Sequence, residues 1–182
     1  MKATYLFLFF LLSVSIQVAA QKSQPAFGKV DKADLEMKDC DFDKGADALV
    51  LIDYGNMYYD RGTVGFSTFK TVYERRTRIK ILKEKGISQA DIEINYYTHN
   101  NEEKVFKFNA NTYNLDAAGK IITTEVKKSS IYSKKIDGNY SKMIIAFPEV
   151  RVGSIIEYSY TIERESYGLR TWYFQGRIPV RY

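Results

Sequence analysis

Cysteine and histidine are almost absent from this chain of 182 residues, which contains one of each. Because Cys40 is the only cysteine, no internal disulfide can form, and the fold must be held together by its core. A chain of this length can bury a core of adequate size. A cysteine hydrolase needs a thiolate beside a histidine, and Cys40 with His99 is the one pair that the sequence offers.

The surroundings of Cys40 and His99 argue against that pair. Asp39 and Asp41 flank Cys40, with Asp43 close by, and neighbouring negative charge disfavours the thiolate that a nucleophile requires. His99 lies in the polar stretch YYTHNNEE between two expected strands. We therefore interpret Cys40 as a partly exposed linker thiol and His99 as a loop imidazole.

Other motifs that would carry chemistry are missing or incomplete. No serine lies in a G-x-S-x-G turn, and no glycine-rich phosphate loop is present. The stretch DCDFDKGAD spaces four aspartates like part of a calcium loop. However, Lys44 occupies the position of the required glycine and Val50 that of the glutamate, so a solvated acidic connector fits better. We assign no catalytic, cofactor-binding or metal-binding residue and expect no cofactor.

The first twenty residues differ from the rest of the chain. Lys2 is followed by an apolar run from Tyr5 to Leu12 and then by Ala19 and Ala20, which predicts a secretory signal peptide over residues 1–20. An uncleaved membrane anchor is the alternative, but the run is short for a membrane span. We expect an exported protein of the periplasm or cell envelope, with no stable membrane span after the signal peptide is cleaved.

Positive charge is scattered rather than concentrated. The formal net charge of +5 gives only a weak preference for acidic partners, and nucleic acid is a poor candidate partner for an exported chain. The densest basic stretch is RRTRIK, residues 75–80. At the period of a strand its charges alternate, which predicts a solvated face made by Arg76, Arg78 and Lys80.

Beyond a lead-in over residues 21–44, apolar residues repeat with a period of two. The lead-in itself is expected to be flexible over residues 21–30 and to contain a short helix over residues 31–38, with Asp31 as N-cap and Leu35 packed. In residues 69–82 the odd positions are mainly apolar and the even positions mainly charged, as in a long strand with one wet face. Residues 154–165 repeat this pattern. Further strands are expected over residues 48–54, 91–97, 103–115, 119–127, 130–136 and 141–147, with a helical turn over residues 83–91.

These strands are separated by turn chemistry, notably at residues 116–119 and 137–139. Many strands at short spacing with few helices predict an all-β fold for residues 45–182. We expect an antiparallel β-sandwich of about 8–10 strands with one or two short helical turns. The 15 tyrosines and 11 phenylalanines allow a sugar-binding surface, although for Tyr73, Tyr158 and Tyr160 we favour packed rings on strand faces.

Five stretches together resemble one family. In combination they are similar to the domain of unknown function that precedes transglutaminase-like domains in exported bacterial proteins, many of them from Bacteroidetes-type organisms. The resemblance covers residues 30 to 182 and implies an all-β sandwich without assigned catalytic residues. In the family a papain-like transglutaminase domain, which carries its own Cys-His-Asp set, commonly follows. The stretches are GADALVLIDYG (45–55), YERRTRIKILKEKG (73–86), TYNLDAAGKI (112–121), FPEVRVGSIIEYSYTIE (147–163) and WYFQGRIPV (172–180).

Neither Cys40 nor His99 matches a position of that catalytic set, and the chain stops at Tyr182. We therefore expect a non-catalytic exported module that docks, positions or presents substrate to a transglutaminase-like cysteine protease or amidase domain, in cis or in trans. In a longer parent protein the sandwich would continue into that domain. The alternatives are a carbohydrate-binding module of the cell envelope and a small enzyme that uses carboxylates. The expected ligand is accordingly a peptide or a glycan.

The last stretch, LRTWYFQGRIPVRY, is too apolar for a frayed tail. Trp172 and Phe174 alternate with their neighbours, which predicts a closing strand that Pro179 limits. We expect the apolar residues after it, Ile178, Val180 and Tyr182, to meet a neighbouring domain.

Overall fold

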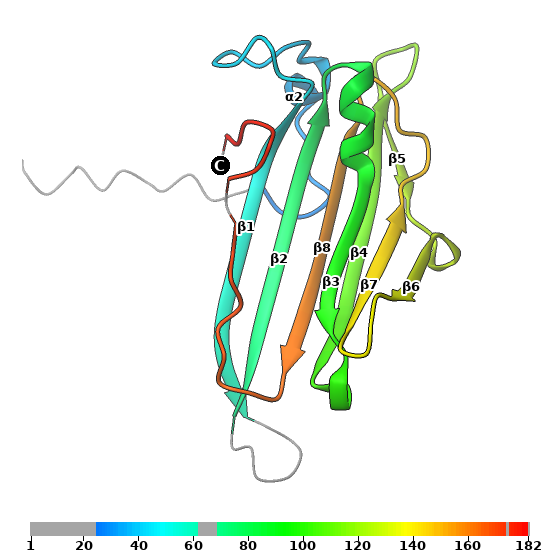
Figure 1. Cartoon of the computed structure of the whole chain (residues 1–182). Helices are drawn as coiled ribbons and strands as arrows, with labels where there is room; N and C mark the ends of the chain where they lie inside the picture. Colours follow the sequence, from blue (N-terminus) through cyan, green and yellow to red (C-terminus); the bar gives the residue numbers. More distant parts are fainter. Residues whose placement is uncertain (1–24, 62–68, 174, 182) are drawn as a thin grey trace, which may run out of the picture.

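The computed structural model describes residues 25–61, 69–173 and 175–181, and the expected signal peptide lies outside them. Eight strands and four short helices form in the described residues (Figure 1). In chain order the elements are α2 (Lys32–Glu36), β1 (Ala48–Arg61), β2 (Phe69–Ile81), η2 (Glu84–Ala90), β3 (Asp91–Tyr97), η3 (His99–Asn101), β4 (Glu103–Leu115), β5 (Ile121–Glu125), η4 (Lys128–Ser130), β6 (Ile131–Lys135), β7 (Tyr140–Ala146) and β8 (Ile155–Arg164).

The strands form two antiparallel sheets that pack face to face. One sheet has five strands in the order β1-β2-β8-β4-β5, and the other has three in the order β3-β7-β6. The core between them contains alternate residues of β8, including Tyr158, Tyr160 and Ile162, against Ile94 of β3 and Ile145 of β7. The expected all-β antiparallel sandwich is therefore confirmed. Its eight strands in the described residues fall within the expected range of about 8–10.

The period-of-two pattern locates the strands well. The bounds of β3 and β4 agree with the expected residues, and β2, β5, β6, β7 and β8 differ from theirs by one or two residues at an end. The strand expected over residues 48–54 continues to Arg61. Gly119 closes the β4–β5 turn with a φ of +74°, a conformation that glycine adopts without strain. The expected short helices are present as α2 and η2.

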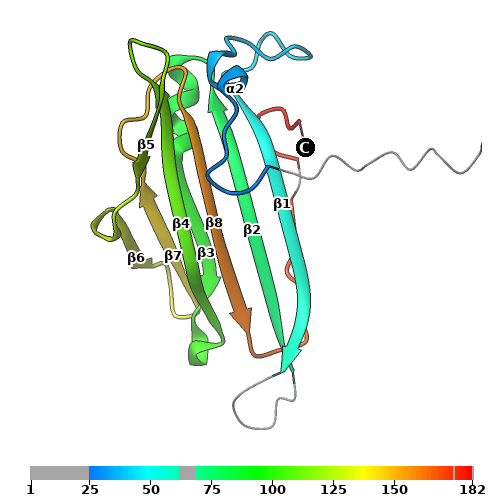
Figure 2. The same ribbon diagram turned by 180° about the vertical axis from the view of Figure 1, so that it is seen from behind.

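The charged face of β2 is not solvated, which corrects the sequence prediction. Arg78 is 1% exposed, and Lys80 is completely buried. The reason lies in the lead-in, because residues 25–47 fold over one end of the outer face of the five-stranded sheet and cover Arg78 and Lys80 (Figure 2). The lead-in therefore packs on the sheet from residue 25 onward, and its Leu35 joins a core cluster with Leu49 and Ile155.

The C-terminal segment is a strap rather than a strand. We define the strap as residues 169–173 and 175–181, which run along β1 at the edge of the large sheet (Figure 1). In these residues the only bridge to a strand joins Val180 and Val50 in parallel. The expected closing strand is therefore wrong for the described residues, while Phe174 and Tyr182 lie outside them. Pro179, which has no N–H, contributes only a carbonyl to this pairing.

Ile178 and Val180 do not project towards a neighbouring domain as the sequence predicted. Both pack against the domain's own core, beside Ile79 and Ile156. Within the described residues, none of the helices is long and apolar enough to cross a membrane.

Candidate functional site

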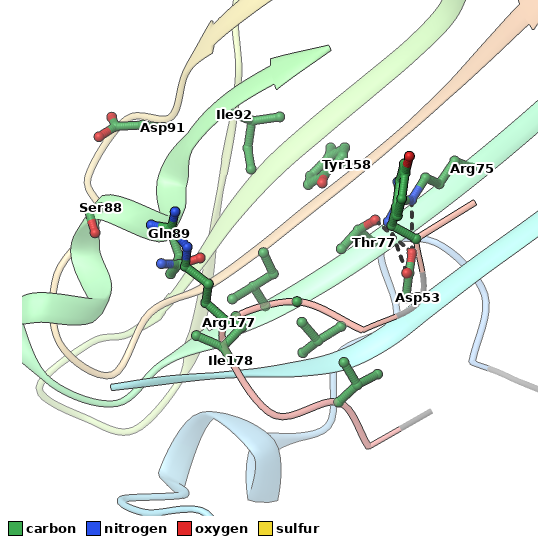
Figure 3. A pocket seen from close by; sticks show the side chains of 15 residues that line it. Asp53, Arg75, Thr77, Ser88, Gln89, Asp91, Ile92, Tyr158, Arg177 and Ile178 are labelled. Atoms are coloured by element: carbon green, nitrogen blue, oxygen red, sulfur yellow. Dashed lines mark hydrogen bonds and ion pairs between the residues drawn. The ribbon is translucent and has the colours of Figure 1, made fainter. Parts of the chain in front are cut away.

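A cleft of about 250 Å³ opens between the strap and the η2–β3 corner (Figure 3). Its floor is the inner face of the large sheet, and the 3₁₀ helix η2 with the start of β3 forms one wall. The strap forms the other wall. The floor residues are Val50, Asp53, Arg75, Thr77, Ile79 and Tyr158. The walls are Ser88, Gln89, Asp91 and Ile92 on one side, and Tyr173, Gly176, Arg177, Ile178 and Val180 on the other.

The register of β1 and β2 places an ion pair in the floor. Asp53 stands opposite Thr77, and Gly55 stands opposite Arg75, so that Asp53 and Arg75 are diagonal neighbours on one face. Arg75 donates from Nε to Asp53 Oδ1 and from Nη2 to Oδ2, each at 2.9 Å. This is the fork geometry in which arginine binds a carboxylate most strongly.

The Asp53 carboxylate also holds the strap. Thr77 Oγ1 donates to Oδ1 at 3.3 Å, and Trp172 Nε1 donates to Oδ2 at 3.2 Å. The indole lies over Gly55, where a side chain would touch the ring. With the two bonds from Arg75, Asp53 accepts four hydrogen bonds, about the capacity of a carboxylate. Asp53 therefore fixes the floor and the strap, and has little capacity left for a ligand.

The tyrosines of this face remain protonated at neutral pH. Burial raises the pKa of Tyr158 in the floor and that of Tyr160 beside it. Burial likewise raises the pKa of Tyr73 to about 12. For Arg75, burial lowers the pKa, but the bonds and charge of Asp53 outweigh it and raise the pKa overall. The floor thus presents a fixed ion pair and the phenol of Tyr158, which suit binding better than proton transfer.

Further contacts anchor the strap at both ends. At one end Arg170 Nη1 donates to both carboxylate oxygens of the buried Glu103, at 3.0 and 3.2 Å, and its Nη2 donates to Asn95 O. At the other end the N–H of Val50 donates to Pro179 O, and the N–H of Arg181 donates to Val50 O, both at 2.9 Å. The cleft wall is therefore tied to β1, β3 and β4.

Cys40 and His99 are not brought together. Cys40 is 1% exposed in the cluster with Ile155 at the start of β8, so its interpretation as a partly exposed linker thiol is wrong. His99 lies in η3, which leads into Glu103, and Glu103 pairs with Arg164 at the end of β8. At about 3.3 Å per residue, the two ends of this strand are ~30 Å apart. His99 contacts the ring of Tyr97 instead.

The acidic connector makes local contacts. Asp39 pairs with Lys44 at 2.7 Å, and Asp43 accepts the N–H of Gly45. Within residues 25–61, 69–173 and 175–181, no group of three or more His, Cys, Asp or Glu side chains is arranged to hold a metal ion.

Sequence reasoning did not find the cleft, although one signal was present. Arg75 is the single charged residue among the mainly apolar odd positions of β2, which indicates a partnered charge on a buried face. Asp53 ends the apolar run ALVLI on the neighbouring strand and supplies that partner. The walls could not be found, because residues 88–92 and the strap meet only in the folded chain.

Comparison with known proteins identifies the family of this fold. A family model matches residues 67–182, which include the cleft floor from β2 and β8, the η2–β3 wall and the strap. The chain belongs to the family described as a domain of unknown function with solved structure, DUF3857. The expected membership of a family of unknown function is thus confirmed, and the association with transglutaminase-like domains stays a prediction.

The DUF3857 chain also aligns with one solved structure, described as a "putative protease" from Parabacteroides distasonis. The identity is 12%, and the TM-score is 0.49. The alignment covers 65% of this chain and only 23% of that protein. No curated protein matches the chain.

Proposed function

We propose that this DUF3857 domain is a non-catalytic, exported module that binds an extended peptide segment in the cleft and presents it to a transglutaminase-like cysteine protease or amidase domain. The observation that carries the proposal is the cleft itself, because an open hollow with a fixed ion pair in its floor lies between two anchored walls. The family resemblance of the sequence supplies the expected partner domain.

The dimensions and chemistry of the cleft suit a peptide. A volume of about 250 Å³ accommodates one or two side chains of an extended chain, rather than a drug-sized ligand. Ile79, Ile92 and the ring of Tyr158 offer apolar contact. Gln89 and Arg177 on opposite walls offer donors to peptide carbonyls (Figure 3).

Exposed apolar side chains in the strap and just before it support docking to the partner domain. Tyr173, at the mouth of the cleft, is 78% exposed. Leu169, the first residue of the strap, and Tyr167 just before it are also among the most exposed large apolar residues, and Tyr167 contacts Phe69 at the start of β2, away from the cleft. Aromatic residues of this kind are enriched in protein–protein interfaces, and a partner domain would bury them while it receives the peptide.

Panning residues 21–182 against a random peptide library displayed on phage tests peptide binding. We expect enriched peptides whose affinity falls at least tenfold in the variant Ser88→Trp, because the indole fills the cleft at an exposed position of η2. Ser129→Trp is the matched control, since Ser129 is exposed on the short helix η4 and does not line the cleft. If no peptides are enriched, or if both variants bind them equally, peptide binding in the cleft is excluded.

A turnover assay with fluorescein-labelled casein tests the non-catalytic part. We expect no hydrolysis or cross-linking by residues 21–182 alone. Activity that disappears in Cys40→Ala would show that the chain is itself a cysteine enzyme, and the proposal would then be abandoned.

Carbohydrate binding is a second candidate, favoured by a different surface. Tyr54 and Tyr58 are 45% and 41% exposed and lie on the outer face of β1, with Asn56 between them. Asn56 and Tyr58 both donate to Glu74 on β2 at 3.4 Å, so that polar groups lie beside the two rings. This combination suits stacking and hydrogen bonding to a sugar chain.

Affinity electrophoresis in gels that contain soluble polysaccharides distinguishes this candidate. If sugars bind here, Tyr58→Ala abolishes the retardation, whereas Tyr132→Ala, an exposed tyrosine of the smaller sheet, leaves it unchanged. Unretarded migration of the wild-type chain in every gel would exclude the candidate.

A further inference from the structure

The outer face of the large sheet buries a row of three cations. Arg76, Arg78 and Lys80 alternate along β2 and all point away from the smaller sheet, towards the lead-in. Glu157 of β8, fully buried, pairs with Arg76 at 2.6 Å and with Arg78 at 2.9 Å. In the described part of the chain no ion pair involves Lys80, so the row carries more positive than negative charge.

Each cation of this row donates a hydrogen bond to a main-chain carbonyl of the lead-in. Arg76 Nη1 donates to Pro25 O, and Arg78 Nη2 donates to Lys29 O at 2.8 Å. Lys80 Nζ donates to Leu35 O at 2.6 Å, and also to Gly153 O in the turn before β8.

The one carboxylate of the row contacts the lead-in in the same way. Glu157 Oε2 accepts the N–H of Gly28 at 3.0 Å. Each charged side chain of the row thus contacts a backbone atom of residues 25–37. The side chains of the lead-in add a cation–π contact from Arg76 to Phe27, the packing of Val30, Leu35 and Met37, and an ion pair from Asp34 to Arg181 of the strap.

Burying these charged side chains costs free energy that an apolar sheet face beneath the lead-in would not require. Burying a charge requires full compensation by hydrogen bonds, and well-packed apolar residues of similar volume often give equal or greater stability. Cations that bind carbonyls, and a carboxylate that binds an N–H, are instead the groups that recognise an extended peptide main chain. The covering segment has one five-residue helix, and a connector in which Asp39, Asp41 and Asp43 are exposed but Cys40 is buried links it to β1.

We propose that Arg76, Arg78, Lys80 and Glu157 form a second peptide-binding site, specific for the main chain of an extended segment, and that residues 25–37 are its resident and exchangeable occupant. The incoming ligand is a segment of another polypeptide that offers carbonyls to the three cations and an aromatic side chain at the place of Phe27. This site is on the opposite face of the large sheet from the cleft, and it stands whether or not the cleft binds peptides.

A labelled peptide tests the exchange. The probe is a synthetic peptide of residues 24–38 with fluorescein, titrated into residues 21–182 and followed by fluorescence anisotropy. The resident segment competes at an effective concentration on the order of millimolar, so binding to the wild-type chain is expected to be weak. In the chain variant Gly28→Pro the resident loses its N–H bond to Glu157 and the φ of +83° that Gly28 requires. We expect this variant to bind the peptide at least tenfold more tightly.

Three controls make the result decisive. A peptide that itself carries Gly28→Pro should bind at least tenfold more weakly, and Lys80→Met in the receptor should weaken binding of the wild-type peptide. Ser88→Trp, which fills the cleft on the opposite face of the sheet, should leave binding of the wild-type peptide unchanged. If Gly28→Pro does not fold, judged by its circular dichroism, Phe27→Ser replaces it. The proposal would be overturned if the wild-type chain and the Gly28→Pro chain bound the peptide equally. It would also be overturned if the wild-type peptide and the Gly28→Pro peptide bound equally.

Discussion

Glu157 is the residue on which the buried charges of the outer face depend. It compensates both Arg76 and Arg78 and also accepts a hydrogen bond from the hydroxyl of Tyr113. We expect Glu157→Gln to lower the free energy of unfolding by about 3–5 kcal/mol, because removing one partner leaves buried charge uncompensated. Urea unfolding followed by circular dichroism measures the change.

The control for Glu157 is Glu93→Gln. Glu93 pairs with Lys142 at 2.7 Å between β3 and β7, where its side chain is about half exposed. Exposed pairs contribute little, so the loss should stay below about 1 kcal/mol. Similar losses in both variants would show that Glu157 has no special role.

Lys80 gives the stability a defined pH dependence. Burial lowers its pKa from the ordinary value of 10.5 to about 8, and the charge of Asp34 opposes this only in part. Between these pH values the unfolded chain binds a proton that the folded chain has released, so the free energy of unfolding rises with pH. We expect a rise of about 2 kcal/mol between pH 8 and 10.

The slope of this dependence, rather than its absolute level, is the readout. Lys80→Met should remove the rise in urea titrations between pH 7.5 and 9.5, and an unchanged slope would contradict the assignment. Above pH 10 the sign reverses. Burial raises the pKa of Tyr73 and Tyr113 to about 12, so the folded chain keeps protons that the unfolded chain loses, and stability falls.

At the scale of elements, η2 depends on a close approach of two backbones. A Cβ atom at Gly86 would lie 2.0 Å from the carbonyl oxygen of Asp47, which precedes β1. Because the clash would be with the backbone of Asp47, a flexible side chain cannot relieve it by moving aside. Gly86→Ala should therefore destabilise the fold by about 3 kcal/mol. Gly138→Ala is the control, because nothing lies near its Cβ position. Equal melting temperatures of the two variants would show that η2 is not packed as described.

The strap carries its own reporter, because Trp172 is the only tryptophan of the chain. In Arg170→Ala the strap loses its bonds to Glu103 and Asn95. We expect acrylamide to quench Trp172 fluorescence about twofold more efficiently, while the circular dichroism of the strands stays unchanged. Arg177→Ala, in the same strap, should leave the quenching at its wild-type value. An unaltered quenching constant in Arg170→Ala would mean that this anchor does not hold the strap.

For the whole molecule, local signals predict the sheets but not what covers them. The period of two places strands such as Asp91–Tyr97, and the turn at residues 116–119 is readable from its glycine. The same alternation misassigned Arg78 and Lys80 to solvent, since nothing in β2 shows that a segment 45 residues earlier will cover them. The strap was misread for a related reason, because alternating aromatic residues suit both a strand and an extended segment pinned by side chains.

The cleft is likewise a product of the whole molecule. Its ion pair joins β1 and β2, and its walls come from residues 88–92 and from the strap, which no local pattern brings together. Peptide binding at this place is the central claim for the function of the domain. A test of this claim also distinguishes the cleft from the two other candidate binding surfaces, which are the exposed tyrosines of β1 and the buried charged residues beneath the lead-in.

The most direct test is a map of chemical shifts in the ¹⁵N-labelled chain, residues 21–182, during titration with the best peptide from the panning experiment. We predict that the amide signals that move most belong to Ser88–Ile92, to the strap around Gly176 and Arg177, and to Thr77 in the floor. Signals confined to the face of Tyr54 and Tyr58, or to residues 25–37, would contradict the account and place the ligand on the other side of the sheet.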